Sequence, residues 1–203
     1  MIALVDYGVG NLFSLRSSFA ALGVETVVTA DPAVIASAER VVLPGVGAFG
    51  DAAKKLAAAG LDRAVVGAAE AGKPLLGICL GMQLLFDVSY EYGTFGGLAL
   101  IPGAVRPIRD KIPADLKIPH IGWNALHFTK PSPLFRYIKE GDFVYFVHSF
   151  AADPNGATIA TAEYGAPLTA AVQRDNVFGC QFHPEKSGDV GLSILRAFCE
   201  VPV

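Results

Sequence analysis

The stretch Pro74-Leu75-Leu76-Gly77-Ile78-Cys79-Leu80-Gly81-Met82-Gln83 leads from an apolar run to a cysteine flanked by glycines. The apolar run predicts a short buried strand over Pro74–Ile78, and Met82–Val88 is predicted to be helical. Gly77-Ile78-Cys79-Leu80-Gly81 has the form of a nucleophile elbow, in which a strained strand-to-helix turn projects the nucleophile. The helix after such a turn directs N–H groups at a thiolate and favours it. The competing interpretation is a buried structural cysteine.

Strands and helices alternate on the N-terminal side of this stretch. Strands are predicted at Ile2–Asp6, Glu25–Thr29 and Arg40–Leu43. Helices are predicted at Leu12–Leu22 and, with an interruption near Gly60, from Gly50 to Ala71. This order indicates a parallel sheet with right-handed crossovers. Active sites of such sheets lie at the carboxyl ends of the strands, so the turns after Asp6, Leu43 and Ile78 are expected at one edge.

The second half of the chain has a different pattern, because helical periodicity nearly disappears between Leu98 and Gln181. Strands are predicted at Phe143–His148, Thr158–Glu163, Leu168–Gln173 and Val177–Phe182, and a last helix at Lys186–Glu200. We expect one α/β domain over residues 1–203. Its open sheet is mixed but mostly parallel and flanked by helices, and antiparallel strands of the second half extend it.

Composition excludes several classes of function. Of the 203 residues 52% are hydrophobic and 17% charged, the net charge is -3, and the basic residues are scattered, so no nucleic-acid or membrane contact is expected. No apolar stretch reaches the roughly 18 residues of a membrane helix, and the first residues lack a secretory signal. Three cysteines, an odd number, suit reduced thiols in the cytoplasm.

No cofactor or metal is expected either. Gly8-Val9-Gly10 follows a predicted strand, but the third glycine of a dinucleotide-binding turn would fall at Phe13. A phosphate-binding loop and a Cys/His pair at zinc spacing are both missing from the sequence.

A catalytic thiol needs a base, and the chain has four histidines. His183 follows the predicted strand Val177–Phe182, and Glu185 stands two residues later, where it could orient the imidazole. His148 also ends a strand and stays a weaker alternative. Backbone N–H groups of Val46, Gly47 and Leu80 could form an oxyanion hole, whose donors typically contribute about 10²–10³-fold each in rate.

Taken together, these segments resemble the class I (triad) glutamine amidotransferases. Further blocks resemble one family within that class, the glutaminase subunits of imidazole glycerol phosphate synthases. These blocks are Asp6–Leu12, Pro44–Phe49, Pro119–Asn124, Phe146–Phe150 and Gln181–Ser187. They are in order and span nearly the whole chain.

The resemblance implies that Cys79, His183 and Glu185 hydrolyse L-glutamine through a thioester. The ammonia would pass to a (β/α)₈-barrel cyclase, with which the chain would form a heterodimer acting in histidine biosynthesis. It further implies two sets of binding residues. Glutamine would be held by Gly45, Gln83, Glu91, His148, Ser149 and Phe150, and the cyclase by Asn11, Trp123 and Lys186.

Five of these roles have a plainer alternative. Gln83 and Glu91 could be surface residues, Asn11 a helix cap, Trp123 a core residue and Lys186 a surface charge. For the whole chain, the alternatives are a stand-alone γ-glutamyl cysteine hydrolase without a partner, and a binding-only regulatory subunit. The first predicts full turnover by the lone chain, and the second is disfavoured by the intact triad.

Overall fold

Strand β1 (Ile2–Val5) shows how the main sheet is buried. Ile2 and Leu4 belong to one hydrophobic cluster, and Ala3 and Val5 belong to another on the opposite face. Successive side chains of a strand point to opposite faces, so a strand that is apolar at every position is buried on both. The main sheet therefore has a hydrophobic core on each of its faces.

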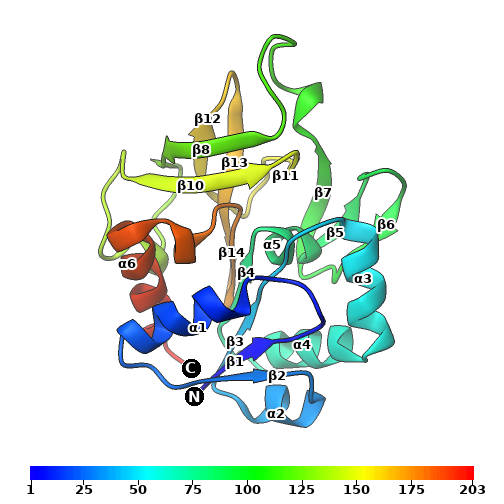
Figure 1. Cartoon of the computed structure of the whole chain (residues 1–203), viewed down its shortest axis with the longest axis vertical. Coiled ribbons are helices and arrows are strands. Elements are labelled where there is room, and N and C mark those ends of the chain that lie inside the picture. The colour runs from blue at the N-terminus through cyan, green and yellow to red at the C-terminus, as the bar shows by residue number, and fades with distance from the viewer.

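The computed structural model describes all residues 1–203, and its main sheet has eight strands (Figure 1). Their order is β2-β1-β3-β4-β14-β13-β12-β9. The parallel part comprises β1, β2 (Thr26–Thr29), β3 (Arg40–Leu43), β4 (Leu75–Ile78) and β14 (Val177–Cys180). The antiparallel part comprises β13 (Pro167–Arg174), β12 (Thr158–Glu163) and β9 (His127–Phe128). The mixed, mostly parallel sheet with an antiparallel extension is confirmed.

Helices cover both faces of the sheet. On one face lie α1 (Leu12–Ala21) and α6 (Gly188–Cys199), and on the other α2 (Pro32–Ser37), α3 (Phe49–Ala58), α4 (Leu61–Glu70) and the short α5 (Leu80–Leu84). Single 3₁₀ turns occur at Ile108–Asp110, Pro133–Phe135 and Pro184–Lys186. The break between α3 and α4 falls at Gly60, as predicted, where φ is +68°.

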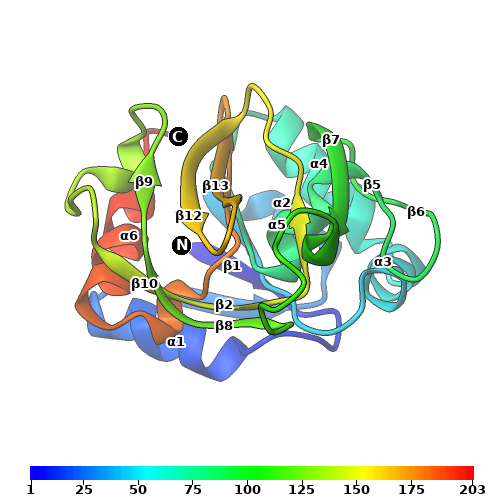
Figure 2. The ribbon, with the colours of Figure 1, turned by 90° about the horizontal axis from the view of Figure 1, so that it is seen from above.

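Two smaller sheets lie beyond the carboxyl ends of the parallel strands. One pairs β8 (His120–Ala125) with β10 (Phe143–His148), and the other joins β11 (Phe150–Ala152), β7 (Ile101–Pro107), β5 (Phe86–Ser89) and β6 (Phe95–Gly96). The interpretation of Phe143–His148 as part of the main sheet is wrong, because β10 pairs only with β8. Figure 2 shows the pair of strands β8 and β10 from above.

The predicted helix over Met82–Val88 is right only as far as Leu84, because the helix ends there and a strand begins at Phe86. Contacts with residues farther along the chain end the helix and begin the strand. The carbonyl of Leu85 accepts the N–H groups of both Leu100 and Ile101, and β5 then pairs with β7. A segment of seven residues, five of them apolar, fits a helix or a strand equally well, so the sequence alone does not settle it.

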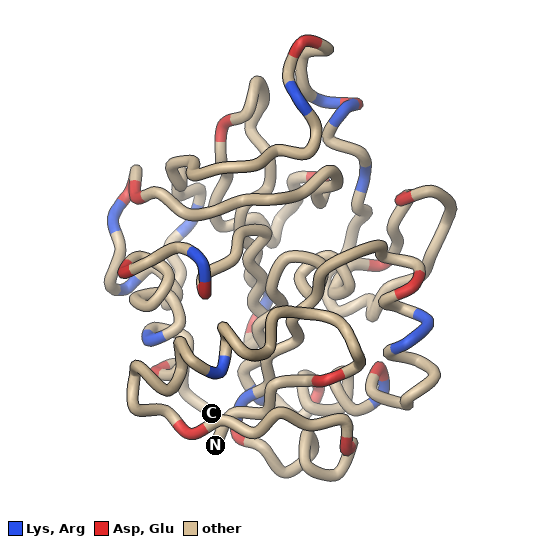
Figure 3. The backbone as a smooth tube through the Cα atoms, viewed as in Figure 1, with Lys and Arg blue, Asp and Glu red and all other residues tan.

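Charged residues are spread over the surface, and Lys and Arg alternate with Asp and Glu without forming one basic face (Figure 3). None of the helices combines the length and the apolar character that crossing a bilayer requires.

Candidate active site

Cys79 occupies the turn between β4 and α5, and its backbone is strained. Its φ of +54° and ψ of -111° lie in a region that residues with a Cβ atom rarely adopt. The Cys79 N–H donates to the carbonyl of Cys180 on the neighbouring strand β14 at 2.7 Å. A Cβ atom at Gly81 would overlap the Leu43 carbonyl, and one at Gly77 would lie 2.7 Å from the Cα atom of Met82. The elbow therefore needs both of its glycines.

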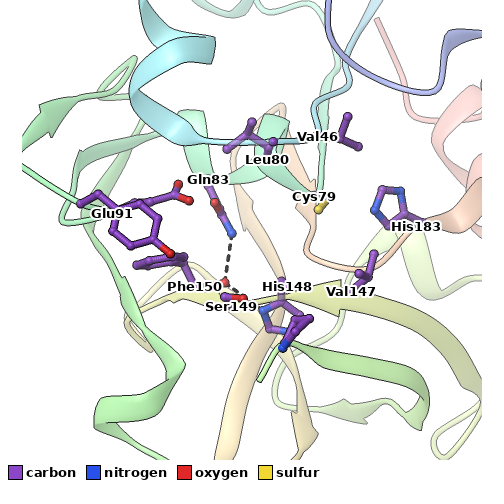
Figure 4. A pocket seen from close by; sticks show the side chains of 13 residues that line it. Val46, Cys79, Leu80, Gln83, Glu91, Val147, His148, Ser149, Phe150 and His183 are labelled. Atoms are coloured by element: carbon purple, nitrogen blue, oxygen red, sulfur yellow. Dashed lines mark hydrogen bonds between the residues drawn. The ribbon is translucent and has the colours of Figure 1, made fainter. Parts of the chain in front are cut away.

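His183 and Glu185 form the second part of the site, directly after β14. His183 Nδ1 donates to Glu185 Oε1 at 2.8 Å, and both side chains are almost fully buried. The second ring nitrogen, Nε2, is buried and has no oxygen or nitrogen partner, which leaves it for Cys79. Figure 4 shows the sulfur and the imidazole on the same side of the pocket. The predicted combination of nucleophile, base and orienting carboxylate is therefore brought together.

The charge of His183 is governed by its two partners. Burial opposes the imidazolium, but hydrogen bonding to Cys79 and to Glu185, together with their negative charges, outweighs burial and raises the pKa of His183 to about 9. A protonated imidazole beside a thiolate is the arrangement expected of an activated cysteine.

We expect this raised pKa to appear as a pH-dependent stability. A group whose pKa is higher in the folded state stabilises fully below its ordinary pKa of 6.5, and this contribution is lost as the pH rises through about 9. The free energy of unfolding of the wild type, minus that of His183→Gln, should therefore fall between pH 6 and pH 10, by on the order of 3 kcal/mol at most. Urea unfolding at several pH values measures this difference, and a constant difference would contradict the assignment.

Cys79 opens into a pocket of about 320 Å³. The wall includes most of the residues predicted to hold glutamine (Figure 4): Gln83, Glu91, His148, Ser149 and Phe150. Gln83 and Glu91 are only 4% and 8% exposed, so their interpretation as ordinary surface residues is wrong. Glu91 Oε2 accepts the N–H of Phe49 at 2.7 Å, and burial raises the pKa of this carboxyl group despite that hydrogen bond.

His148, the alternative base, has a different environment. Its Nδ1 donates to the carbonyl of Phe150 at 2.8 Å, which fixes Nε2 as the acceptor for His120 Nδ1 at 3.0 Å. Burial lowers the pKa of His148 to about 3, so the imidazole is neutral. Both ring nitrogens are occupied, and we infer that His148 supports the backbone at Phe150 rather than Cys79.

The segment Pro44–Gly47 lies beside the elbow. The N–H groups of Val46 and Gly47 make no hydrogen bond within the protein, whereas the N–H of Leu80 donates to the carbonyl of Gly45 at 3.3 Å. Of the three predicted oxyanion donors, Leu80 is therefore already occupied. The Tyr7 hydroxyl donates to the Pro44 carbonyl at 2.7 Å and holds this segment against the sheet.

Gln181 is a residue of the site to which sequence reasoning assigned no role. Its side chain is fully buried, and its Nε2 lies 3.7 Å from Cys79 Sγ. A signal was present in the sequence, because a lone amide in the apolar run Val177–Phe182 must find hydrogen-bond partners once it is buried. The sequence did not show that one partner would be the cysteine.

The residues predicted to face a partner lie on elements of one side of the molecule. In Figures 1 and 2, α1, β8 and β10 lie along the same side. Trp123 is 60% exposed and packs edge-on against Tyr145, over whose ring Lys186 Nζ lies at 5.8 Å. Trp123 is therefore not a core residue. The Asn11 side chain accepts the N–H of Ser14 and caps α1, a contact compatible with either interpretation of Asn11.

Comparison with known proteins agrees with this geometry. The family model described as "Glutamine amidotransferase class-I" matches residues 3–200, so the chain is a class I glutamine amidotransferase. It is 48% identical over 207 residues to the imidazole glycerol phosphate synthase subunit HisH of Syntrophotalea carbinolica, with 98% of each chain covered. Identity to the HisH subunit of Methanothermobacter thermautotrophicus is 46%, over 99% of this chain and 98% of the relative. Within its class, the chain belongs to the HisH family.

Solved structures share the fold at low identity. A crystal structure of a glutamine amidotransferase superposes with a TM-score of 0.75 at 18% identity, covering 98% of this chain and all of the other. PurLQS from Thermotoga maritima superposes with a TM-score of 0.73 at 19% identity, covering 98% and 96%. The predicted class of fold is therefore confirmed.

Proposed function

We propose that this chain is the ammonia-producing subunit of an imidazole glycerol phosphate synthase. It hydrolyses glutamine to glutamate and ammonia, and the ammonia passes to a (β/α)₈-barrel cyclase that makes imidazole glycerol phosphate and aminoimidazole carboxamide ribotide. The observation that carries the chemistry is the buried Cys79, His183 and Glu185 at one pocket. The family membership carries the pathway.

The proposed reaction has two halves. The Cys79 thiolate attacks the side-chain amide carbon of glutamine, and His183, held by Glu185, gives its proton to the departing ammonia. The resulting γ-glutamyl thioester is then attacked by water, from which His183 now removes a proton. Collapse of this second intermediate releases glutamate and restores the thiolate.

The oxyanion hole is proposed to be closed in this structure. The Leu80 N–H next to the nucleophile already donates to Gly45, so it cannot also stabilise an oxyanion. We propose that the Pro44–Gly47 segment changes conformation when the partner and its nucleotide bind, and that it then offers the N–H of Val46 or Gly47. Gly47 has a φ of +97°, and glycine tolerates this conformation and the change in backbone angles that the movement of the segment requires. An activated complex with the Leu80–Gly45 hydrogen bond intact would contradict this.

We propose that oxygen atoms of the pocket wall bind the positively charged α-ammonium group of glutamine. The carboxylate of Glu91 and the amide oxygen of Gln83 suit the α-ammonium group of glutamine. The backbone at Gly45 and at His148–Phe150 supplies the remaining contacts. Phe150 has no hydroxyl group, so any contribution here comes from its backbone or its ring, which packs edge-on against Tyr92 at 5.6 Å.

The cyclase is proposed to bind the side formed by α1, β8 and β10. Exposed Trp123, Ile121 and Phe13 give this side an apolar character, and Lys186 adds a positive charge near them. Large exposed apolar side chains on one side of a protein are typical of an interaction surface. A cytoplasmic location is proposed as well, supported by three free cysteines that suit a reducing compartment.

The alternative, a stand-alone γ-glutamyl cysteine hydrolase, is not favoured, because the relatives that match over the full length are synthase subunits. The decisive measurement is glutamate release from glutamine by the chain alone, and then with the cyclase and its nucleotide ligand. We expect a very low rate alone and an increase of at least about 100-fold in the complex, which is the contribution of one oxyanion donor. A high rate that is indifferent to the partner would favour the independent hydrolase.

A further inference from the structure

Two buried amides connect the pocket wall to the nucleophile. Gln83 Nε2 donates to the carbonyl of Phe150 at 3.0 Å and also to Gln181 Oε1 at 3.0 Å. Gln181 Nε2 in turn lies 3.7 Å from Cys79 Sγ, at hydrogen-bonding distance for a sulfur acceptor. Gln181 is 0% exposed and does not line the pocket, so it is not placed to touch glutamine.

The hydrogen bond between Gln83 and Phe150 fixes which groups donate and which accept in this series of hydrogen bonds. A backbone carbonyl can only accept, so the group of Gln83 that faces Phe150 must be the NH₂ group. The second hydrogen of that NH₂ group then points at Gln181, so the atom of Gln181 that accepts it must be the amide oxygen. Only the NH₂ group of Gln181 is left for Cys79. The orientation of both amides follows from this count of donors and acceptors.

We propose that Gln181 is a further residue of the reaction, a neutral hydrogen-bond donor that stabilises the Cys79 thiolate. This inference rests on the proposed glutaminase function. A hydrogen bond to a charged acceptor is stronger than one between neutral groups, so the contact favours the thiolate over the thiol. It also favours the sulfur as a leaving group when the second tetrahedral intermediate collapses. The His183 imidazolium supplies the opposite charge, and Gln181 supplies a donor that does not change its protonation during turnover.

The β14 strand explains why this position suits the role. Cys180 N–H and C=O groups belong to the central sheet, and the Cys180 carbonyl accepts the N–H of Cys79. The Gln181 N–H donates to the carbonyl of Ala170 on β13 at 2.8 Å, so its backbone is held as well. A rigid backbone and a shared amide leave the donor little freedom to turn away from the sulfur.

The test compares Gln181→Met with Gln173→Met. Methionine is similar to glutamine in length but lacks the N–H donor. Gln173 lies on β13, where its Nε2 reaches only the carbonyl of Asp175, so the control makes the same change away from the pocket. The first readout is the rate of alkylation of Cys79 by iodoacetamide against pH, with Cys79→Ala as the blank for Cys180 and Cys199.

For Gln181→Met we expect the alkylation profile to move to higher pH, and the rate near pH 6 to fall about tenfold to a hundredfold, the range of a hydrogen bond to a charged group. Glutamine hydrolysis by the complex should fall by a similar factor in kcat. Gln173→Met should match the wild type in both readouts. A purely structural role would lower the melting temperature of Gln181→Met without moving the profile, and that result would overturn the proposal.

If Gln181→Met does not fold, Gln181→Glu is tested instead, because glutamate has the same shape as glutamine. Its carboxylate accepts from Gln83 but opposes a thiolate, so we expect a larger shift in the same direction. An unchanged profile in this variant would also overturn the proposal. Failure of the proposed function is distinguishable, because in that case the wild-type complex itself would not release glutamate.

Discussion

Replacing Cys79 with alanine is expected to abolish glutamine-dependent activity of the complex while ammonia-dependent activity continues. Only the nucleophile is removed, because an alanine keeps the Cβ atom and the backbone of the elbow. We expect the glutaminase rate to fall by at least about 10⁴-fold, as when other covalent nucleophiles are removed. The measurement is formation of imidazole glycerol phosphate with glutamine and, separately, with an ammonium salt as nitrogen source.

The matched control is Cys199→Ala, which removes a thiol at the far end of α6, outside the pocket. We expect near wild-type rates with both nitrogen sources. Residual use of glutamine by Cys79→Ala would show that the nucleophile has been assigned incorrectly. Loss of the ammonia-dependent rate would instead point to a defect in association with the cyclase.

Gly81→Ala is expected to have the largest effect on stability of any single methyl addition near the site. Its Cβ atom would overlap the carbonyl oxygen of Leu43, and the backbone at both residues is held in the sheet or at its edge. Neither can move without displacing β3 or α5. We therefore expect a loss of about 3 kcal/mol in the free energy of unfolding, or failure to fold.

Gly67→Ala provides the comparison, since Gly67 lies inside α4 and a Cβ atom there meets nothing within 4 Å. Alanine inside a helix is favoured over glycine by about 0.5–1 kcal/mol, so this variant should be more stable than the wild type. Urea unfolding of both variants gives the two values. If Gly81→Ala unfolded at the same urea concentration as Gly67→Ala, the close contact between α5 and β3 would be refuted.

The strands that agree best with prediction are those with a clear local signal. Arg40–Leu43, Phe143–His148 and Thr158–Glu163 have the predicted bounds, because at least half of the residues in each are β-branched or aromatic. Alternation within a run shows which residues share a face but not which strand is the neighbour. The pairing of Phe143–His148 with His120–Ala125 therefore emerged only from the fold.

The residues of the site likewise fall into those that a sequence motif identifies and those that only the structure identifies. Cys79, His183 and Glu185 could be selected from sequence because each stands in a short motif with a chemical reason for its spacing. Gln181 could not be assigned its role, because a distance between side chains on neighbouring strands is not encoded in either strand alone. The occupied N–H of Leu80 was equally hidden, since backbone donors leave no signature in the side chains.

The positive φ of Cys79 has a consequence for how this protein will respond to selection or engineering. Glycine would adopt the same backbone conformation without strain, so the best residue for the fold at position 79 is not the residue that the chemistry needs. A screen that rewards heat resistance alone would therefore drift towards a more robust and inactive protein. Thermostable versions of this chain should be sought with position 79 held constant.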